Sequence, residues 1–196
     1  MLEEIILLEN DVVQLRPVQL DDVEGIAKAA KYPEIWEHMS VTLLTEEAVL
    51  QHVKKSIKER ETNQTYMFVI VHKASNRIIG CTSFLDIAEN HKRLEIGSTW
   101  ITPEFWRTDV NTNCKYLLLT YCFERMKLNR VQIKTGHENI RSQKAIERLG
   151  ATKEGILRNH MIRKEGNIRH TVMYSIIKEE WPEIKEKFLS KLLNNQ

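Results

Sequence analysis

The sequence predicts one mixed α/β domain, because segments with helical and with strand periodicity alternate along all 196 residues. The clearest helix lies in Asn139–Ala151, where small and apolar side chains recur at i, i+3, i+4 and i+7 and Gly150 stands where a helix-ending glycine is expected. The strand pattern of Arg130–Thr135 comes just before it, and the same strand–loop–helix order occurs once upstream. No linker, repeat or low-complexity tract interrupts the pattern, so residues 1–196 are expected to form a single domain.

The first third of the chain predicts one strand and two helices. Val12–Arg16 has the strand pattern, and Pro17 ends it because proline lacks the N–H that a sheet needs. Leu20–Lys31 has apolar side chains at helical spacing behind an acidic first turn, which the helix dipole favours. Thr45–Glu61 begins with a threonine and two glutamates and continues as a second amphipathic helix.

The middle of the chain predicts three strands and a core helix. Met67–Val71 is a continuous apolar strand, and a turn joins it to the strand Arg77–Ile87. Leu94–Ile101 is the next strand, and Thr112–Lys127 is a helix with one broad apolar face.

The last third predicts a hairpin and a closing helix. Thr152–Ile162 and Ile168–Ile177 are two strands joined by a turn around Gly166. Trp181–Leu193 is a helix with Pro182 in its first turn, where proline is tolerated.

Composition indicates an ordinary globular protein, with 42% hydrophobic and 29% charged residues. No run of 18 apolar residues predicts a membrane span, and the acidic start of the chain lacks the features of a signal peptide. Cys114 and Cys122 are eight positions apart on one predicted helix, about 12 Å along its axis, too far for a disulfide. With Cys81 the cysteines are odd in number, so we expect reduced thiols and a cytoplasmic location.

The charges are distributed unevenly. Residues 1–62 hold 13 acidic and 7 basic side chains (net −6), whereas residues 139–170 hold 8 basic and 3 acidic ones (net +5). This pattern is typical of a solvated surface and also of a basic rim for phosphates or an acidic substrate. No aromatic residues interleave the basic ones as in nucleic-acid-binding motifs, and the seven histidines lack metal-ligand spacing, so we expect neither nucleic acid nor a metal.

The two strand–loop–helix units predict a site for a phosphate-bearing cofactor. Each loop leads to the start of a helix, where unpaired backbone N–H groups point outward and bind anions. The chain contains no G-x-x-x-x-G-K-S/T, G-x-G-x-x-G or G-x-S-x-G motif, which argues against a P-loop NTPase, a dinucleotide enzyme and an α/β-hydrolase.

Three motifs in order carry a family resemblance: EIGSTWITPEFWRT, N-x-x-S-x-x-AIERLGA and EGILRNHMIRKEGNIRHTVMYSI. Over Leu15–Trp181 the chain resembles the GNAT superfamily of acetyl-CoA-dependent N-acetyltransferases, and especially its Rim-type, ribosomal-protein N-acetyltransferase-like branch. The resemblance implies a mostly antiparallel mixed sheet flanked by helices, with a splayed central pair of strands. It also implies acetyl-CoA as co-substrate.

In this family a loop of the form R/Q-x-x-G-x-G/A holds the coenzyme pyrophosphate on its backbone N–H groups. Here Trp106 replaces the Arg/Gln and Asp109 replaces the first glycine, although the branch pattern R-T-G-x-N otherwise fits. A carboxylate beside a polyanion is repelled, so either Asp109 points away while its N–H still serves, or coenzyme binding is weak. The coenzyme-binding residues that the resemblance implies are Ile101, Thr102, Arg107, Thr108, Asp109, Val110, Asn111, Thr112, Asn139 and Ser142.

The resemblance also implies catalytic roles. Ser142 would donate a proton to the departing thiolate, and Asn139 would contact the pantetheine arm; the alternatives are a packing residue and a helix cap. Glu95 would be the general base, unless it is a surface carboxylate. Some Rim-type enzymes use a glutamate at the position of Met161, so the neighbouring His160 is the substitute, with a structural histidine as the alternative.

Together these features predict an acyltransferase that moves an acetyl group from acetyl-CoA to a primary amine, either a protein N-terminus or a small amine, by direct attack in a ternary complex. We expect a monomer or homodimer. The alternatives are a non-catalytic or weakly active coenzyme-A-binding regulatory module and a domain that binds acidic partners through its basic surface.

Overall fold

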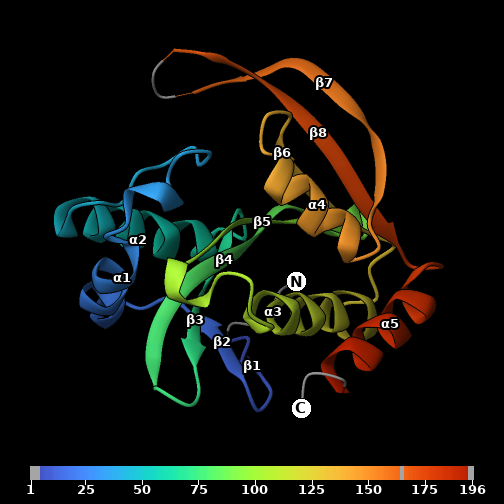
Figure 1. Ribbon diagram of the computed structural model, residues 1–196, viewed down its shortest axis with the longest axis horizontal. Helices are drawn as coiled ribbons and strands as arrows, with labels where there is room; N and C mark the ends of the chain where they lie inside the picture. The colour runs from blue at the N-terminus through green and yellow to red at the C-terminus, as the bar shows by residue number, and fades with distance from the viewer. Residues whose placement is uncertain (1–4, 164–165, 194–196) are drawn as a thin grey trace.

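The computed structural model describes residues 5–163 and 166–193, and its strands form one eight-stranded sheet (Figure 1). Their order is β1-β2-β3-β4-β5-β6-β8-β7, and every neighbouring pair is antiparallel except the parallel pair β5–β6. The predicted mostly antiparallel mixed sheet is therefore confirmed. The strands are β1 (Leu8–Glu9), β2 (Val13–Pro17), β3 (Tyr66–His72), β4 (Arg77–Ala88), β5 (Arg93–Ile101), β6 (Arg130–Gly136), β7 (Thr152–Ile162) and β8 (Ile168–Ile177).

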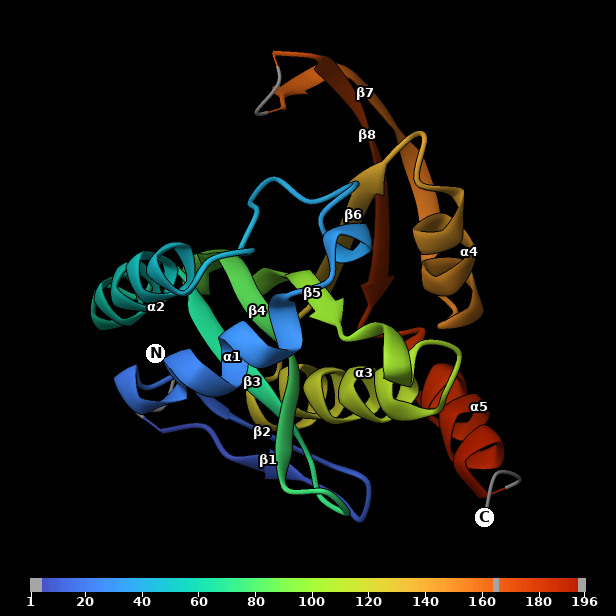
Figure 2. The same cartoon turned by 60° about the vertical axis from the view of Figure 1, so that its left-hand side comes forward.

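The helices cover the two faces of the sheet unequally. α1 (Val23–Ala30) and α2 (Glu46–Glu61) pack on β3 and β4, while α3 (Val110–Thr120), α4 (Ile140–Arg148) and α5 (Trp181–Leu193) lie on the opposite face. Figures 1 and 2 show that the long β7–β8 hairpin rises beside α4 and α5 and curves over toward the side of α1 and α2, but does not reach these two helices in either view. Among the described elements, no helix therefore covers the face of β6 and β8 on the side of α1 and α2.

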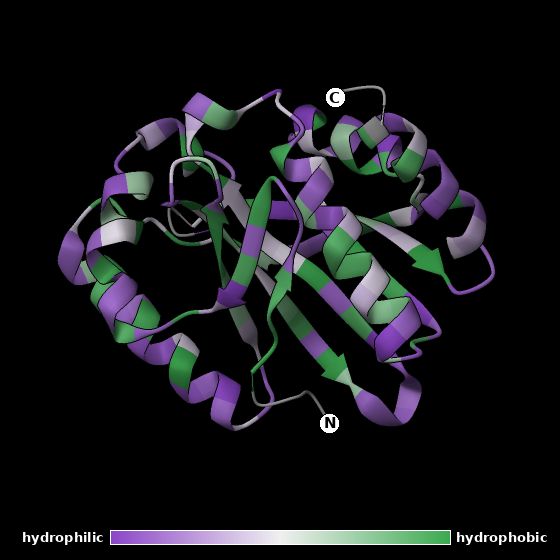
Figure 3. Ribbon diagram, turned by 90° about the horizontal axis from the view of Figure 1, so that it is seen from below, coloured by the Kyte–Doolittle hydropathy of each residue, from purple (hydrophilic) through white to green (hydrophobic). Residues whose placement is uncertain are grey.

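Side chains along each strand point alternately to the two faces of the sheet, and they contribute to one hydrophobic core on each face. In β3, Phe68 and Ile70 join the core under α3, whereas Met67 and Val69 join the core under α1 and α2. A central strand buried on both faces reads as a continuous apolar run, as predicted for this segment. Figure 3 shows hydrophobic and hydrophilic residues intermixed along the helices, whereas the strands in the middle of the molecule include long hydrophobic stretches.

The central pair of strands separates after three residues. β5 pairs with β6 only from Arg93 to Glu95, although β5 continues to Ile101 and β6 to Gly136. Ser98 has a φ of +48°, and the pairing of β4 with β5 shifts there, so a bulge turns β5 away from its neighbour. The splayed central pair that the resemblance implied is present.

Some boundaries differ from those predicted. The helix predicted from Leu20 begins with a 3₁₀ turn, Leu20–Asp22, before α1. The helix predicted over Thr112–Lys127 starts at Val110, and its last turn, Tyr121–Arg125, is a π-helix in which the N–H of Met126 donates to the carbonyl of Tyr121. The two-residue strand β1 was not predicted. No helix in the described part of the chain is long and apolar enough to cross a membrane.

Candidate active site

The segment that leads from β5 into the first turn of α3, residues 106–112, presents several unpaired backbone N–H groups, and we call it the phosphate loop. Arg107 has a φ of +63°, which turns the chain so that successive N–H groups point outward before the helix begins. Within the described residues no hydrogen-bond acceptor is found for the N–H groups of Arg107, Thr108, Asp109, Asn111 and Thr112. Such an array at the start of a helix is suited to binding phosphate.

Asp109 does not adopt the conformation that would require glycine. Its φ is −77°, in the right-handed region, and the positive φ falls on Arg107 instead. The Asp109 carboxylate is held by the first turn of α3, because Asn113 donates to its Oδ2 at 3.2 Å. The Asn113 Oδ1 in turn accepts from Asn10 at 2.7 Å. The loop therefore keeps its shape with aspartate at this position.

The start of α4 lies beside this loop. Asn139 caps α4 through its Oδ1, which accepts from the N–H of Ser142 at 3.0 Å. The prediction that Asn139 caps the helix is therefore confirmed, and its amide nitrogen takes no part in the cap. The Ser142 hydroxyl is half-buried and has no intramolecular partner in the described part of the chain.

Trp106 contacts both the end of β5 and the first turn of α4. Its indole nitrogen donates to the carbonyl of Ile101 at 2.7 Å, and the Arg141 guanidinium lies 4.2 Å from the centre of its ring. A cation over an aromatic face is attracted to it. The residue that replaces the family Arg/Gln thus packs the phosphate loop against the first turn of α4. The sequence pattern alone did not indicate this contact.

Glu95 points to the face opposite α3 and α4. Its neighbours Leu94 and Ile96 belong to the core under α3, so alternation directs the Glu95 side chain to the other side. The residue is 1% exposed, and its Oε2 lies 2.8 Å from Lys134 Nζ and accepts from Gln132 at 3.3 Å. Glu95 is therefore a buried, ion-paired carboxylate at the base of the splay and not a surface strand residue.

The structure does not bring His160 to Glu95. β7 is the outer edge strand, and three strand spacings, roughly 14 Å, separate it from β5. The His160 ring bonds Thr171 on the adjacent strand, with Nδ1 and Oγ1 3.1 Å apart. Tyr174 on β8 is fully buried and its hydroxyl donates to Glu147 at 2.9 Å; burial and this bond raise its pKa to about 12.

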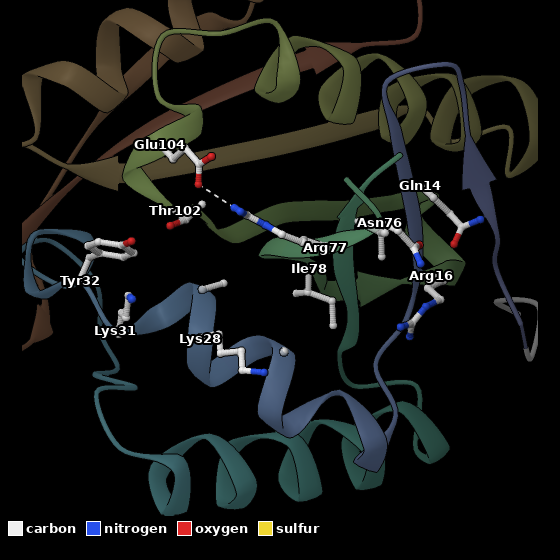
Figure 4. Close-up of a pocket in the computed structure, with 13 residues that line it drawn as sticks. Gln14, Arg16, Lys28, Lys31, Tyr32, Asn76, Arg77, Ile78, Thr102 and Glu104 are labelled. Carbon is white, nitrogen blue, oxygen red and sulfur yellow. Dashed lines mark hydrogen bonds and ion pairs between the residues drawn. The ribbon is translucent and has the colours of Figure 1, made fainter. Parts of the chain in front are cut away.

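Thr102 does not line the same surface as residues 106–112. Its N–H donates to Ile79 at 2.7 Å, and its side chain lines a hollow beside α1 and the β3–β4 turn (Figure 4). The cations around this hollow mostly have carboxylate partners, as Arg77 has in Glu104 at 2.6 Å. None of residues 107–112 lines the hollow, so it is separate from the array of free N–H groups.

A buried cation lies below the bulge of β5. Lys115 of α3 is 5% exposed and donates from Nζ to Thr99 Oγ1 at 2.7 Å, and Thr99 is 2.8 Å from Thr82 Oγ1. No carboxylate pairs with Lys115 among the described residues, and burial lowers its pKa to about 8. Lys115 was not predicted from the sequence as a functional residue. It lies four residues after Asn111 and three before Leu118, and this spacing places it on the buried stripe of the helix.

The cysteines take no part in this region. Cys81, Cys114 and Cys122 are free, as predicted, and all three are buried. Burial raises the pKa of each thiol, which makes a reactive thiolate unfavourable. Within the described residues no group of three or more His, Cys, Asp or Glu side chains is placed to hold a metal ion.

Residues 13–152 match the family model described as acetyltransferase (GNAT) domain. The chain belongs to the GNAT acetyltransferase family. It is 26% identical over 175 residues to the uncharacterized N-acetyltransferase p20 of Bacillus licheniformis, an alignment that covers 89% of this chain and 97% of p20. It is 34% identical over 104 residues to Bacillus subtilis YdaF, assigned as a ribosomal N-acetyltransferase, covering 53% and 56% of the two chains.

A solved structure assigned as an acetyltransferase of T. thermophilus superimposes with a TM-score of 0.88 at 32% identity, covering 98% of this chain and 100% of that one. The family relatives thus extend over nearly all of the chain and include ribosomal N-acetyltransferase-like proteins. As a GNAT family member the protein is an acyltransferase.

Proposed function

We propose that this GNAT protein transfers an acetyl group from acetyl-CoA to an amine by direct attack in a ternary complex. The observation that carries the proposal is the splay between β5 and β6, which has two helix starts on one face and the Glu95 carboxylate on the other. A donor on the first face and an acceptor on the second would meet through the gap.

The residues present fit the coenzyme. The free N–H groups of Arg107, Thr108, Asp109, Asn111 and Thr112 are suited to the pyrophosphate, and the Ser142 hydroxyl at the start of α4 has no partner within the described residues. When bound, acetyl-CoA supplies an acetyl group activated as a thioester. The chain itself provides a backbone N–H near Ile101 to polarise the carbonyl, the Ser142 hydroxyl as proton donor to the thiolate, and Glu95 as proton acceptor for the amine, directly or through water.

The second candidate is a coenzyme-A-binding module without useful turnover. It is supported by the ion pair of Glu95 with Lys134, because a carboxylate engaged by a cation is less available to take a proton. Turnover of acetyl-CoA with an amine separates the two functions.

The proposal is tested in two steps. Acetyl-CoA should raise the melting temperature, because a ligand that binds only the folded state stabilises it by about 2.7 kcal/mol at a hundredfold excess over Kd. Release of free thiol from acetyl-CoA should then depend on an added amine. A folded protein with no thermal shift at millimolar acetyl-CoA contradicts coenzyme binding, and a shift without amine-dependent thiol release favours the binding module.

A further inference from the structure

Three cations lie at the open end of the splay, on the face of the sheet that bears Glu95. Lys134 projects from β6, Arg163 follows β7, and Arg169 lies on β8. A side chain added at Gly136, the last residue of β6, would come within 3.4 Å of Arg169 Nε and 3.5 Å of Arg163 Nη2. Both guanidinium groups therefore lie over the end of β6, in the space that the glycine leaves. We call Lys134, Arg163 and Arg169 the basic cluster.

The basic cluster carries one more positive charge than its carboxylate partners neutralise. Lys134 pairs with Glu95 at 2.8 Å, and Arg163 pairs with Glu138 at 2.7 Å. Arg169 has no ion-pair partner in the part of the chain that the structure describes, so three cations face two carboxylates and the sum is +1. The Nε atoms of Arg163 and Arg169 are also buried without a hydrogen-bond acceptor in the described residues. An unmatched guanidinium with unpaired donors is suited to a carboxylate.

The basic cluster lies close to the proposed point of reaction. Burial and the positive charge of Arg163 lower the pKa of Arg169, and the negative charge of Glu95 raises it, so both charges act on this guanidinium. The α1 and α2 helices do not cover this part of the sheet, because they pack on β3 and β4. Arg169 lies over Gly136, two residues beyond Lys134 on β6, so an amine that reaches the Glu95–Lys134 pair would have its nearby substituents toward Arg169.

We propose that Arg169, aided by Arg163, binds a carboxylate of the acceptor, so that this enzyme prefers amines that carry an acid group close to the amine. The inference rests on the proposed function, because it assigns the substrate class of the same site. Such a carboxylate comes from a free amino acid or from an acidic side chain at the start of a peptide. A polyamine, which carries only positive charge, is a poor acceptor for this surface.

The test compares matched acceptors in the thiol-release assay. Free amino acids are compared with their amides, and amidated peptides that begin with Asp are compared with the same peptides that begin with Asn. For the wild type we expect kcat/KM to be about 10- to 100-fold higher for the acid in at least one of these pairs, since hydrogen bonds to charged groups contribute about 1.5–3 kcal/mol. The pair that shows the difference identifies the source of the carboxylate.

Variants then assign the preference to Arg169. Arg169→Gln should remove the preference by slowing the acid and leaving the amide nearly unchanged, and Arg169→Lys should retain part of it. Arg125→Gln makes the same charge change at an exposed residue of the π-helical turn after α3, on the other side of the sheet, and should change neither rate. An acetyl-CoA thermal shift equal to that of the wild type shows that each variant is folded.

Two results overturn the inference. Equal kcat/KM for acid and neutral acceptors in both pairs would show that the basic cluster does not select the acceptor. An equal loss with both acceptors in Arg169→Gln would show that the residue acts on the fold or the coenzyme. Either result leaves the proposed function in place, whereas the absence of thiol release with every acceptor removes both proposals.

Discussion

Glu95 Oε2 and Lys134 Nζ lie 2.8 Å apart across the two central strands; Glu95 is the last residue of β5 that pairs with β6, and Lys134 lies two residues beyond its partner Gln132. The ion pair therefore closes the base of the splay on the face opposite α3. Both side chains are largely buried, so the loss of one charge would leave the other without compensation, which is costly. A change at Lys134 can therefore distinguish a structural role of Glu95 from a chemical one, because it breaks the ion pair but keeps the Glu95 carboxylate.

Glu95→Gln should lower kcat by about 100-fold or more, the usual range for loss of a proton-transfer group, and should remove the acidic limb of the pH–rate profile. The matched variant Lys134→Gln breaks the same ion pair but keeps the carboxylate, so it should retain that limb. Steady-state rates between pH 5 and 9 measure both effects. Equal losses in the two variants, with unchanged profiles, would mean that only the ion pair matters and that the base lies elsewhere.

Ser142→Ala should lower kcat by about 10- to 100-fold while acetyl-CoA affinity changes little. The task of the hydroxyl is modest, because a thiol has a pKa near 8.5 and its thiolate leaves readily. The cap of α4 uses the backbone N–H of Ser142, so alanine keeps it. Asn139→Ala is the contrasting variant: it removes the cap and should cost about 1 kcal/mol of unfolding free energy. Full kcat in Ser142→Ala would identify that residue as packing alone.

Asp109→Gly should alter acetyl-CoA affinity by less than about threefold, that is, by under about 0.7 kcal/mol. The backbone at Asp109 does not need glycine, and its carboxylate is already occupied by Asn113. Titration calorimetry measures the affinity directly. Tightening by more than tenfold would show that the carboxylate faces the phosphates, and Asn113→Ala, which frees the carboxylate, should then weaken binding.

Lys115→Met should stabilise the protein at pH 7 and flatten its dependence on pH. Burial lowers the pKa of Lys115 from 10.5 to about 8, so the folded state binds this proton more weakly than the unfolded chain does. Stability of the wild type should therefore rise as pH increases from about 8 to 10.5, by an amount on the order of 3 kcal/mol. Urea unfolding at pH 7, 8.5 and 10 checks both statements. Easier unfolding of Lys115→Met at pH 7 would show that the bond to Thr99 outweighs the cost of burying the charge.

Periodicity predicted most elements, because helices and strands bury their apolar faces at a fixed spacing. Thr45–Glu61 differs from α2 by one residue, and Thr152–Ile162 coincides with β7. The π-helical turn was missed, because one extra residue in a helix hardly alters an apolar stripe. β1 was missed because two residues on an edge strand are too few to show alternation.

The site was predictable only as far as it depends on chain order. The free N–H groups at the phosphate loop follow from a strand, a loop and a helix in sequence. The partner of Glu95 could not be read in this way, because it depends on which strand lies beside β5 and in which register. The same holds for Arg169, whose contact with Gly136 is set by the pairing of β6 with β8 and by the irregular pairing of β7 with β8.

The separation of β5 from β6 gives the sheet two additional edges in its middle, since within the described chain Gly97–Ile101 and Ile133–Gly136 have no strand partner on the sides that face each other. Strand edges with unpaired N–H and C=O groups readily pair with other extended chains, and proteins usually protect them. The amide groups in the arm of coenzyme A are able to occupy these edges. We therefore expect the protein to self-associate more readily on storage without coenzyme than with it, which light scattering of the two samples would measure.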